Sequence, residues 1–264
     1  MSALVSFASL VSKFNRSGHT WCRDVPVWGG RFSGTSFDRL LYLYLHKWRV
    51  LGGHETRLLR RHITPGMTVL DLGANIGFYT VFLSRLVGEH GRVFAFEPEP
   101  SLFACLERNC LVNAAGNVRL HRAAVGAESG TATISRSAVN SGDTRVWGTG
   151  HGDAASVRVV TVDEALGDVR PDFIKMDVQG YELKALRGMT RILANTPRLM
   201  IYLEFWPFGL RSVGDAPSAL LDWLVAESFT LYADDGLERP IADRAAYCRT
   251  LDAKAYGHIL AVRS

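Results

Sequence analysis

The stretch Val69-Leu-Asp-Leu-Gly-Ala-Asn-Ile-Gly-Phe-Tyr-Thr80 decides the fold of this chain of 264 residues. It consists of a short apolar run that ends in an acid, a turn with two glycines, and the start of an apolar helix over residues 78–87. Gly73 permits a tight turn and a close approach of a ligand to the backbone. Such a turn between strand and helix is typical of α/β proteins, although it also occurs without a ligand.

Strands and helices alternate on both sides of this element. Residues 92–97 and 117–125 predict strands, with a helix over 101–113 between them. The remaining expected strands are residues 67–71, 172–177, 198–204, 229–233 and 258–262, and the remaining helices are 181–187 and 218–227. Short connections between alternating elements favour parallel pairing. We therefore expect an α/β, Rossmann-like fold: a mostly parallel seven-stranded sheet with helices on both faces and a terminal hairpin at its edge.

Residues 126–161 interrupt this alternation. Residues 130–135 and 156–162 alternate like antiparallel strands, and the segment 140–152 between them is rich in glycine and polar groups. A loop of that length is usually functional or mobile. We expect an N-terminal helical cap over residues 1–62 and a main domain over 63–264 that carries this insert. In the cap, the spacing of Leu4, Phe7, Val11 and Phe14 predicts a short amphipathic helix that packs on the main domain or on a second subunit of a homodimer.

Charge is spread unevenly along the chain. Residues 1–62 contain ten basic and three acidic side chains, a balance of +7, whereas residues 63–264 contain 20 and 23, a balance of −3. The simplest interpretation of the arginine-rich excess is genomic coding bias, and a surface for nucleic acid or an acidic substrate is the alternative. No apolar run approaches the roughly 20 residues that span a bilayer. The composition also excludes intrinsic disorder.

The cysteine pattern indicates a reducing compartment. Cys22, Cys105, Cys110 and Cys248 form no CxxC spacing, so the usual zinc and redox motifs are absent. The apolar N-terminal stretch has no preceding basic region, unlike a secretion signal. We expect reduced thiols in a cytoplasmic protein.

Polar or small residues close five of the expected strands. They are Asp71, Glu97, the pair Ala123-Ala124, Asp177 and Glu204. The carboxyl ends of parallel strands share one edge, where such sheets bind ligands, so we expect these residues to meet in one crevice. Asn75 replaces the middle glycine of the dinucleotide fingerprint, and an acid before the turn suits a cationic ligand better than a phosphate. Glu97 can accept both hydroxyls of a ribose, a role that we favour over that of a solvated acid.

Three motifs together resemble one protein family. Residues 69–80 resemble the first motif of class I S-adenosylmethionine-dependent methyltransferases, and Phe96-Glu-Pro98 resembles their second. Phe173-Ile-Lys-Met-Asp-Val-Gln-Gly-Tyr-Glu-Leu183 narrows the resemblance to the FkbM family, which covers roughly residues 55–205. The family usually has Asp-x-Glu-Gly at positions 177–180. Here Gln179 replaces the glutamate, so one carboxylate is missing near the expected site.

The resemblance implies S-adenosylmethionine as cofactor, and we expect the class I methyltransferase domain to span residues 63–264. The cofactor-binding residues that it implies are Asp71, Gly73, Ala74, Asn75, Gly77, Glu97, Pro98, Ser101, Ala123, Ala124 and Asp177. Asp71 and the turn 73–77 would hold the methionine part, and Glu97 would bind the ribose hydroxyls. Pro98 and Ser101 would lie near the adenine, and Ala123 or Ala124 would leave room for its ring. Asp177 would sit beside the sulfonium and face the acceptor.

A hydroxyl acceptor must also lose its proton, so a base is needed. The candidate catalytic residues are Asp177, Glu204 and His151. The first two can equally orient substrate or cap a helix, and His151 can equally be a solvated loop residue. Candidate acceptor-binding residues in the same loop are Asn140, Asp143, Arg145 and Trp147, with a solvated turn as the alternative. Two strand-end acids do not define a magnesium site and no His/Cys cluster suggests zinc, so we expect no metal.

The sequence therefore predicts an S-adenosylmethionine-dependent O-methyltransferase that acts on a hydroxyl of a small molecule: a sugar, a glycolipid or a secondary metabolite. The alternative is an RNA methyltransferase that uses the basic N-terminal segment. The chain has no Asn/Asp-Pro-Pro-Tyr/Phe string, which makes nucleic acid the weaker hypothesis. A nicotinamide-dependent oxidoreductase is disfavoured because no Tyr-x-x-x-Lys pair is present. A non-catalytic binding module is disfavoured because the turn and Glu97 are intact.

Overall fold

A computed structural model describes residues 25–27, 29–34, 53–135, 145–146, 154–233, 240–251 and 255–264. Its strands are β1 (Val25–Val27), β2 (Gly30–Phe32), β3 (Thr68–Leu72), β4 (Arg92–Phe96), β5 (Val118–His121), β6 (Ala124–Val125), β7 (Gly130–Ser135), β8 (Arg145–Val146), β9 (Ala154–Val160), β10 (Phe173–Met176), β11 (Leu199–Phe205), β12 (Thr230–Ala233) and β13 (Gly257–Arg263). Its helices are α3 (Gly53–His62), α4 (Phe78–Val87), α5 (Pro100–Val112), α6 (Val162–Leu166), α7 (Glu182–Arg187), α8 (Thr190–Ala194), α9 (Pro207–Ser212), α10 (Pro217–Ala226) and α11 (Arg244–Thr250).

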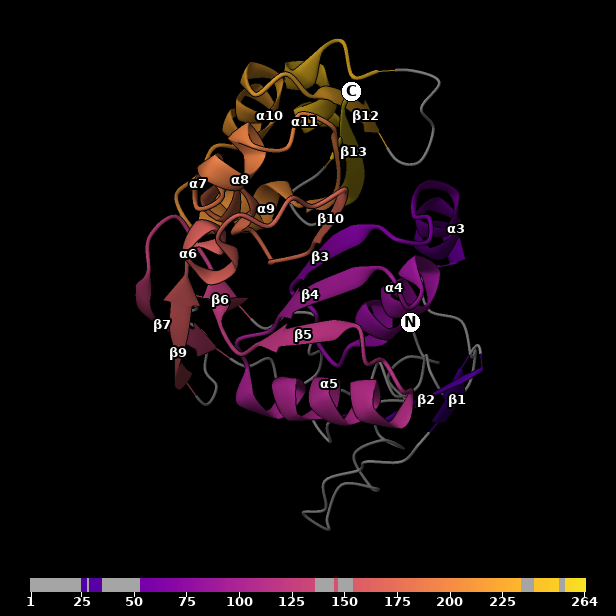
Figure 1. Ribbon diagram of the computed structural model, residues 1–264. Helices are drawn as coiled ribbons and strands as arrows, with labels where there is room; N and C mark the ends of the chain where they lie inside the picture. Colours follow the sequence, from indigo (N-terminus) through magenta and orange to yellow (C-terminus); the bar gives the residue numbers. More distant parts are fainter. Residues whose placement is uncertain are drawn as a thin grey trace, which may run out of the picture.

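A seven-stranded sheet with the order β12-β13-β11-β10-β3-β4-β5 forms the centre of the molecule (Figure 1). Strands β11, β10, β3, β4 and β5 pair in parallel, and β13 runs antiparallel between β11 and β12. The expected mostly parallel sheet is confirmed, including the terminal hairpin. The chain moves outward from β3 in one direction and from β10 in the other. A crevice for ligands is expected at this reversal, at the carboxyl ends of β3 and β10.

Helices cover both faces of the sheet (Figure 1). Alternate residues of the parallel strands face opposite layers, which explains why β3, β4 and β10 are almost wholly buried. Leu70 and Leu72 join the core under α7, α8 and α10. Val69 joins the other core, where Leu58 and Leu59 of α3 and the apolar side of α4 pack. No described helix combines the length and apolar character needed to cross a bilayer.

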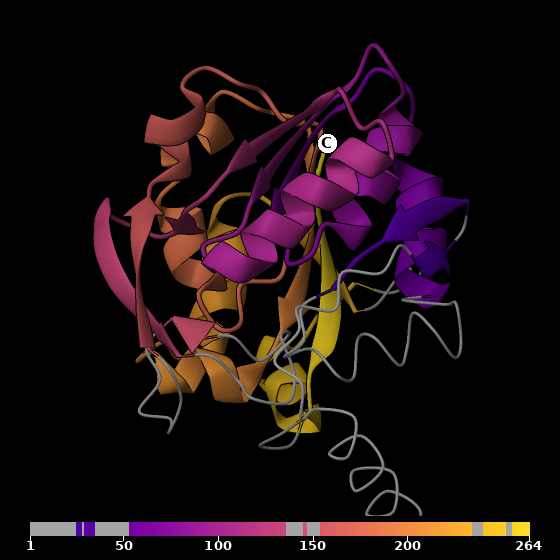
Figure 2. The same ribbon diagram turned by 90° about the horizontal axis from the view of Figure 1, so that it is seen from below.

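A small second sheet, with the order β6-β9-β7-β8, lies beyond β5 (Figure 2). The expected antiparallel pairing of residues 130–135 with the strand after the loop is confirmed by β7 and β9. The expected single strand over residues 117–125 is wrong. β5 ends at His121, the chain turns where the Ala123 N–H bonds to the His121 carbonyl, and β6 pairs with β9. The turn places Ala123 and Ala124 at the rim of the main sheet.

Buried Asn109 of α5 fixes the glycine-rich turn in place. Its side-chain amide donates to the carbonyl oxygens of Ser33 (2.8 Å) and Ile76 (2.7 Å), and its oxygen accepts from the Ser33 N–H. The Asn109 side chain thus links α5, the segment after β2 and the turn after β3.

Helix α5 itself starts with Pro100 after Glu99, whose carboxylate caps the helix by accepting from the Leu102 N–H at 2.6 Å.

Candidate active site

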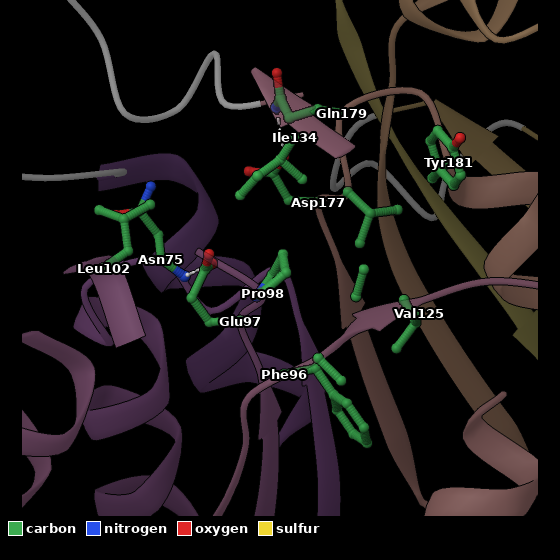
Figure 3. Close-up of a pocket in the computed structure, with 14 residues that line it drawn as sticks. Asn75, Phe96, Glu97, Pro98, Leu102, Val125, Ile134, Asp177, Gln179 and Tyr181 are labelled. Atoms are coloured by element: carbon green, nitrogen blue, oxygen red, sulfur yellow. Dashed lines mark hydrogen bonds between the residues drawn. The ribbon is translucent and has the colours of Figure 1, made fainter. Parts of the chain in front are cut away.

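A pocket opens where the sheet order reverses (Figure 3). Its lining comes from the ends of β3, β4 and β10, from the turn before β6, and from α5 and β7. The lining residues are Gly73, Asn75, Phe96, Glu97, Pro98, Leu102, Ala123, Ala124, Val125, Ile134, Asp177, Val178, Gln179 and Tyr181. Most of the lining is apolar, and two carboxyl groups, those of Glu97 and Asp177, belong to it. Such a concave site with a few convergent polar groups is the usual form of a cofactor site.

Two loops meet at the floor of this pocket. Gly73 has φ of +85°, and a Cβ placed on it would lie 1.9 Å from the carbonyl oxygen of Asp177. Only glycine therefore allows the turn after β3 to touch the loop after β10. Asn75 (φ +52°) and Gln179 (φ +54°), one on each loop, also adopt the left-handed conformation. Such backbone costs free energy for residues with a Cβ, and it concentrates at functional sites.

Glu97 is the buried carboxyl of the pocket. Its Oε2 accepts a hydrogen bond from the Asn75 N–H (2.9 Å) and its Oε1 from the Glu99 N–H (2.9 Å). Figure 3 shows the carboxyl group beside Asn75 at the pocket wall. Burial, together with the nearby charges of Glu99 and Asp71, raises the pKa of Glu97 to about 8. Each oxygen holds one backbone donor and keeps a lone pair for a ligand hydroxyl.

A single amide joins the two strand-end acids of β10 and β11. The Nε2 of Gln179 donates to Asp177 Oδ1 at 2.7 Å and to Glu204 Oε2 at 2.9 Å. Burial and the neighbouring charges of Asp177 and Glu182 raise the pKa of Glu204 well above its usual range. A glutamate at position 179 would offer a third carboxylate here, whereas the glutamine supplies a donor. Gln179, which stands where the family usually has glutamate, therefore holds the two acids together.

Beneath this edge lies a buried ion pair. The Nζ of Lys175 lies 3.8 Å from Asp71 Oδ1 and 4.7 Å from the centre of the Tyr79 ring, and Thr80 Oγ1 donates to Asp71 Oδ2 at 2.6 Å. Burial raises the pKa of Asp71, and Lys175 and Thr80 offset part of that rise. Burial works against the charge of Lys175, yet Asp71, Asp177, Glu55 and Glu204 raise its pKa. Lys175 is therefore a cation, and it neutralises part of the negative charge at this edge.

The structure brings most of the expected cofactor residues to the pocket. Those in the lining are Gly73, Asn75, Glu97, Pro98, Ala123, Ala124 and Asp177. Four others lie outside it: Asp71 faces Lys175, Ala74 is buried under the turn, Gly77 opens α4 against Leu106, and Ser101 donates to Glu99. Asn140, Asp143, Trp147 and His151 are outside the described residues, as is the N-terminal amphipathic helix, and of Arg145 only the backbone in β8 is described.

Several polar residues of this edge were not expected from the sequence. The sequence carries a signal for Lys175 alone among them: a lysine between the apolar residues of a buried strand needs a buried partner of opposite charge. Glu55 of α3 and His258 of β13 meet at the same edge, where Oε1 of Glu55 lies 3.1 Å from Nε2 of His258. Nothing in their local sequence indicates this, since they are 203 positions apart in the chain. Among the described residues, no cluster of three or more His, Cys, Asp or Glu could hold a metal ion.

The sequence of the chain is similar to those of known methyltransferases. The model of the methyltransferase FkbM domain matches residues 71–231. The hexuronic acid methyltransferase AglP of Haloferax volcanii is 29% identical over 188 residues, which are 69% of this chain and 73% of AglP. Methyltransferase 1 of Beauveria bassiana is 25% identical over 144 residues, 46% of this chain and 57% of that protein. Among solved structures, the O-methyltransferase TomG of Streptomyces achromogenes in complex with SAM has a TM-score of 0.48 at 14% identity, with 81% of each chain covered.

The strand order, the glycine-rich turn and the pocket at the reversal define a class I S-adenosylmethionine-dependent methyltransferase. The chain belongs to the FkbM methyltransferase family, and S-adenosylmethionine is its cofactor. The donor set of the pocket fits this molecule. Pro98, Leu102 and the small Ala123 offer an apolar surface to an adenine, and Glu97 offers hydrogen-bond acceptors to a ribose. Asp177 brings negative charge to the end where the cationic part would lie.

Proposed function

We propose that this protein methylates a hydroxyl oxygen of a small molecule: a sugar, a glycolipid or a secondary metabolite. The observation that carries the proposal is a pair of carboxyl groups joined by the amide of Gln179: Asp177, which lines the pocket, and Glu204, which is outside the lining but bonded to Gln179. Hydrogen-bond acceptors next to the methyl donor are what a hydroxyl acceptor requires, because its proton must leave as the new bond forms. AglP, by its name, acts on a hexuronic acid, which supports a carbohydrate-like acceptor.

The cofactor residues are assigned from the lining of the pocket. Glu97 accepts hydrogen bonds from the ribose hydroxyls, and Ala123 and Ala124 leave space for the adenine. The backbone of the turn 73–77 binds the methionine part. Asp71 stabilises this turn indirectly: it accepts a hydrogen bond from Thr80 of α4, and Lys175 neutralises part of its charge. The methyltransferase domain is proposed to span residues 63–264, with residues 1–62 as a cap and 126–161 as an insert.

The chain's own contribution to the reaction is orientation and proton removal. S-adenosylmethionine, when bound, supplies an activated methyl group. Glu204 is the preferred base because burial and neighbouring carboxylates raise its pKa, which increases its affinity for the proton of the acceptor. Asp177, which lines the pocket, orients the acceptor hydroxyl towards the cofactor. Gln179 keeps the two carboxyl groups at a fixed separation. His151 stays a second candidate base.

Three further assignments complete the proposal. No metal ion takes part in the transfer, and the carboxyl groups act directly. The reaction takes place in the cytoplasm; the described cysteines Cys105, Cys110 and Cys248 form no disulfide with one another. A homodimer in which the N-terminal helix packs on the second subunit remains the proposed assembly.

The test has a binding arm and a product arm. Calorimetry should show binding of S-adenosylhomocysteine, weakened by roughly 1.5–3 kcal/mol in Glu97→Ala through loss of two hydrogen bonds to the ribose. The protein is then incubated with S-adenosylmethionine and a panel of alcohols, methyl glycosides, a uronic acid glycoside and total RNA. Nuclear magnetic resonance of the products should show a methyl ether. A product that is solely a methyl ester or an N-methyl base would refute hydroxyl methylation, and unchanged binding by Glu97→Ala would refute the ribose contact.

A further inference from the structure

The acceptor edge continues beyond the two carboxyl groups to a third strand. Met176 of β10 pairs with Leu203 of β11, so Asp177 follows beside Glu204, and Glu204 pairs with His258 of β13. Paired residues of adjacent strands point to the same face of a sheet. Asp177, Glu204 and His258 therefore form a row along the carboxyl edge. With neighbouring strands about 4.8 Å apart, the row extends about 10 Å from the cofactor pocket to His258.

His258 is oriented by contacts with Glu55 of α3 and Tyr202 of β11. Its Nε2 lies 3.1 Å from Oε1 of Glu55 on α3, and Tyr79 of α4 donates its hydroxyl hydrogen to the same carboxylate. Its ring stacks on Tyr202 at 5.2 Å between centroids and 10° between planes. In the tautomer that donates Nε2–H to Glu55, Nδ1 is a hydrogen-bond acceptor. Among the described residues, no hydrogen bond to Nδ1 is formed.

An exposed aromatic ring flanks the His258 end of this row. Tyr256 immediately precedes β13, is 60% exposed, and meets the His258 ring edge-on at 5.9 Å and 88°. Tyr256 is thus an exposed aromatic side chain in direct contact with the row. Aromatic rings beside hydrogen-bond acceptors suit a ligand with an apolar face and several hydroxyls.

The charge of the edge selects against an anion. Asp177, Glu204 and Glu55 contribute carboxyl groups, and burial of Glu55 is outweighed by His258 and Lys175, which lower its pKa so that it is ionised. The nearest lysine, Lys175, is 4% exposed and is directed at Asp71, so it offers little charge to a ligand. An acceptor carboxylate would meet like charges here. A neutral molecule would meet acceptors for its hydroxyl hydrogens.

We propose that His258, oriented by Glu55 and flanked by Tyr256, forms the distal end of the acceptor subsite and binds a second hydroxyl of a neutral, polyhydroxylated ring. The hydroxyl donates its hydrogen to Nδ1, and the ring lies along the row with its reacting hydroxyl at Asp177 and Glu204. His258 is thus a specificity-determining residue. This inference rests on the proposed function, since it assumes a hydroxyl acceptor.

The test compares His258→Gln with a matched control, His90→Gln. His90 is exposed in the turn between α4 and β4, at the opposite edge of the sheet. The probes are the methyl glycosides of glucose, galactose and mannose, and methyl glucuronide as the anionic counterpart. For the glycoside that wild-type protein turns over best, His258→Gln should raise KM by about tenfold, the value of one hydrogen bond, with kcat little changed. Affinity for S-adenosylhomocysteine should stay the same, and His90→Gln should match wild type in all three.

The outcomes separate this inference from the proposed function. An unchanged KM in His258→Gln, or an equal loss of affinity for S-adenosylhomocysteine, overturns the role of His258 while hydroxyl methylation stands. A wild-type preference for the glucuronide overturns the neutral acceptor. Failure of wild type to methylate any of the glycosides, despite cofactor binding, removes the proposed carbohydrate hydroxyl and the role of His258 with it.

Discussion

Replacement of Glu97 by glutamine should make the cofactor-free protein more stable in alkali and less stable in acid. Glu97 is 5% exposed and accepts one backbone N–H on each oxygen, from Asn75 and Glu99. Burial raises its pKa from 4.5 to about 8. A carboxyl group whose pKa is raised on folding contributes stability below its unfolded value, and that contribution is lost as pH rises through the folded value. Glutamine does not ionise, so the variant lacks this loss.

The magnitude follows from the two pKa values. The difference between 4.5 and about 8, at about 1.4 kcal/mol for each pKa unit, corresponds to roughly 5 kcal/mol. Against this, glutamine turns one oxygen into an amide donor, which leaves one backbone N–H unpaired and costs about 1–3 kcal/mol at every pH. The free energy of unfolding of Glu97→Gln should therefore lie about 1–3 kcal/mol below wild type at pH 4.5. At pH 9 it should lie roughly 2–4 kcal/mol above wild type.

Urea unfolding followed by circular dichroism measures this difference across the pH range. Other buried carboxyl groups, such as Glu182, with a pKa raised to about 7, also change the stability of wild type. They are common to both proteins, so the difference between the two isolates Glu97. Exposed Glu89, replaced by glutamine, is the matched control and should follow wild type throughout. A difference that stays constant between pH 4.5 and 9 would show that burial does not hold the proton on Glu97.

Two further predictions concern the floor of the site. Gly73→Ala places a Cβ 1.9 Å from the Asp177 carbonyl oxygen, at a residue with φ of +85°, so the two loops must separate. Calorimetry should show at least a tenfold loss of affinity for S-adenosylhomocysteine, about 1.4 kcal/mol. Unchanged affinity would mean that the loops adapt. Lys175→Met leaves Asp71 as a buried acid without its cation, and urea unfolding at pH 8 should show a loss of about 3–5 kcal/mol. The loss in free energy of unfolding should shrink towards pH 5, because the pKa of Asp71 is raised and a proton can replace the missing cation. An equal loss at pH 8 and pH 5 would indicate a packing defect instead.

The sequence allowed the core of the fold to be predicted because its signals are local. The run 69–80 carries its own strand, turn and helix start, and the strand-end acids follow from hydrophobic patterning. The break after His121 was missed because residues 117–125 have the composition of one continuous strand. Only pairing of β6 with β9, some 35 residues later in the chain, divides it. Glu97 was found from its place after a strand, but its hydrogen bonds with the Asn75 and Glu99 N–H groups were not.

What the sequence by itself determined is the class of protein, the order of elements and the cofactor half of the site, since these depend on residues close together along the chain. The tertiary structure alone decided the arrangement of residues in the proposed acceptor half. β13 returns antiparallel beside β11 and brings His258 opposite Glu204, and α3 then supplies Glu55 from nearly the other end of the described chain. It also decided that Gln179 joins two acids and that Lys175 is directed at Asp71. Local patterning reveals which face a side chain occupies, whereas its partner depends on which strand lies next to it.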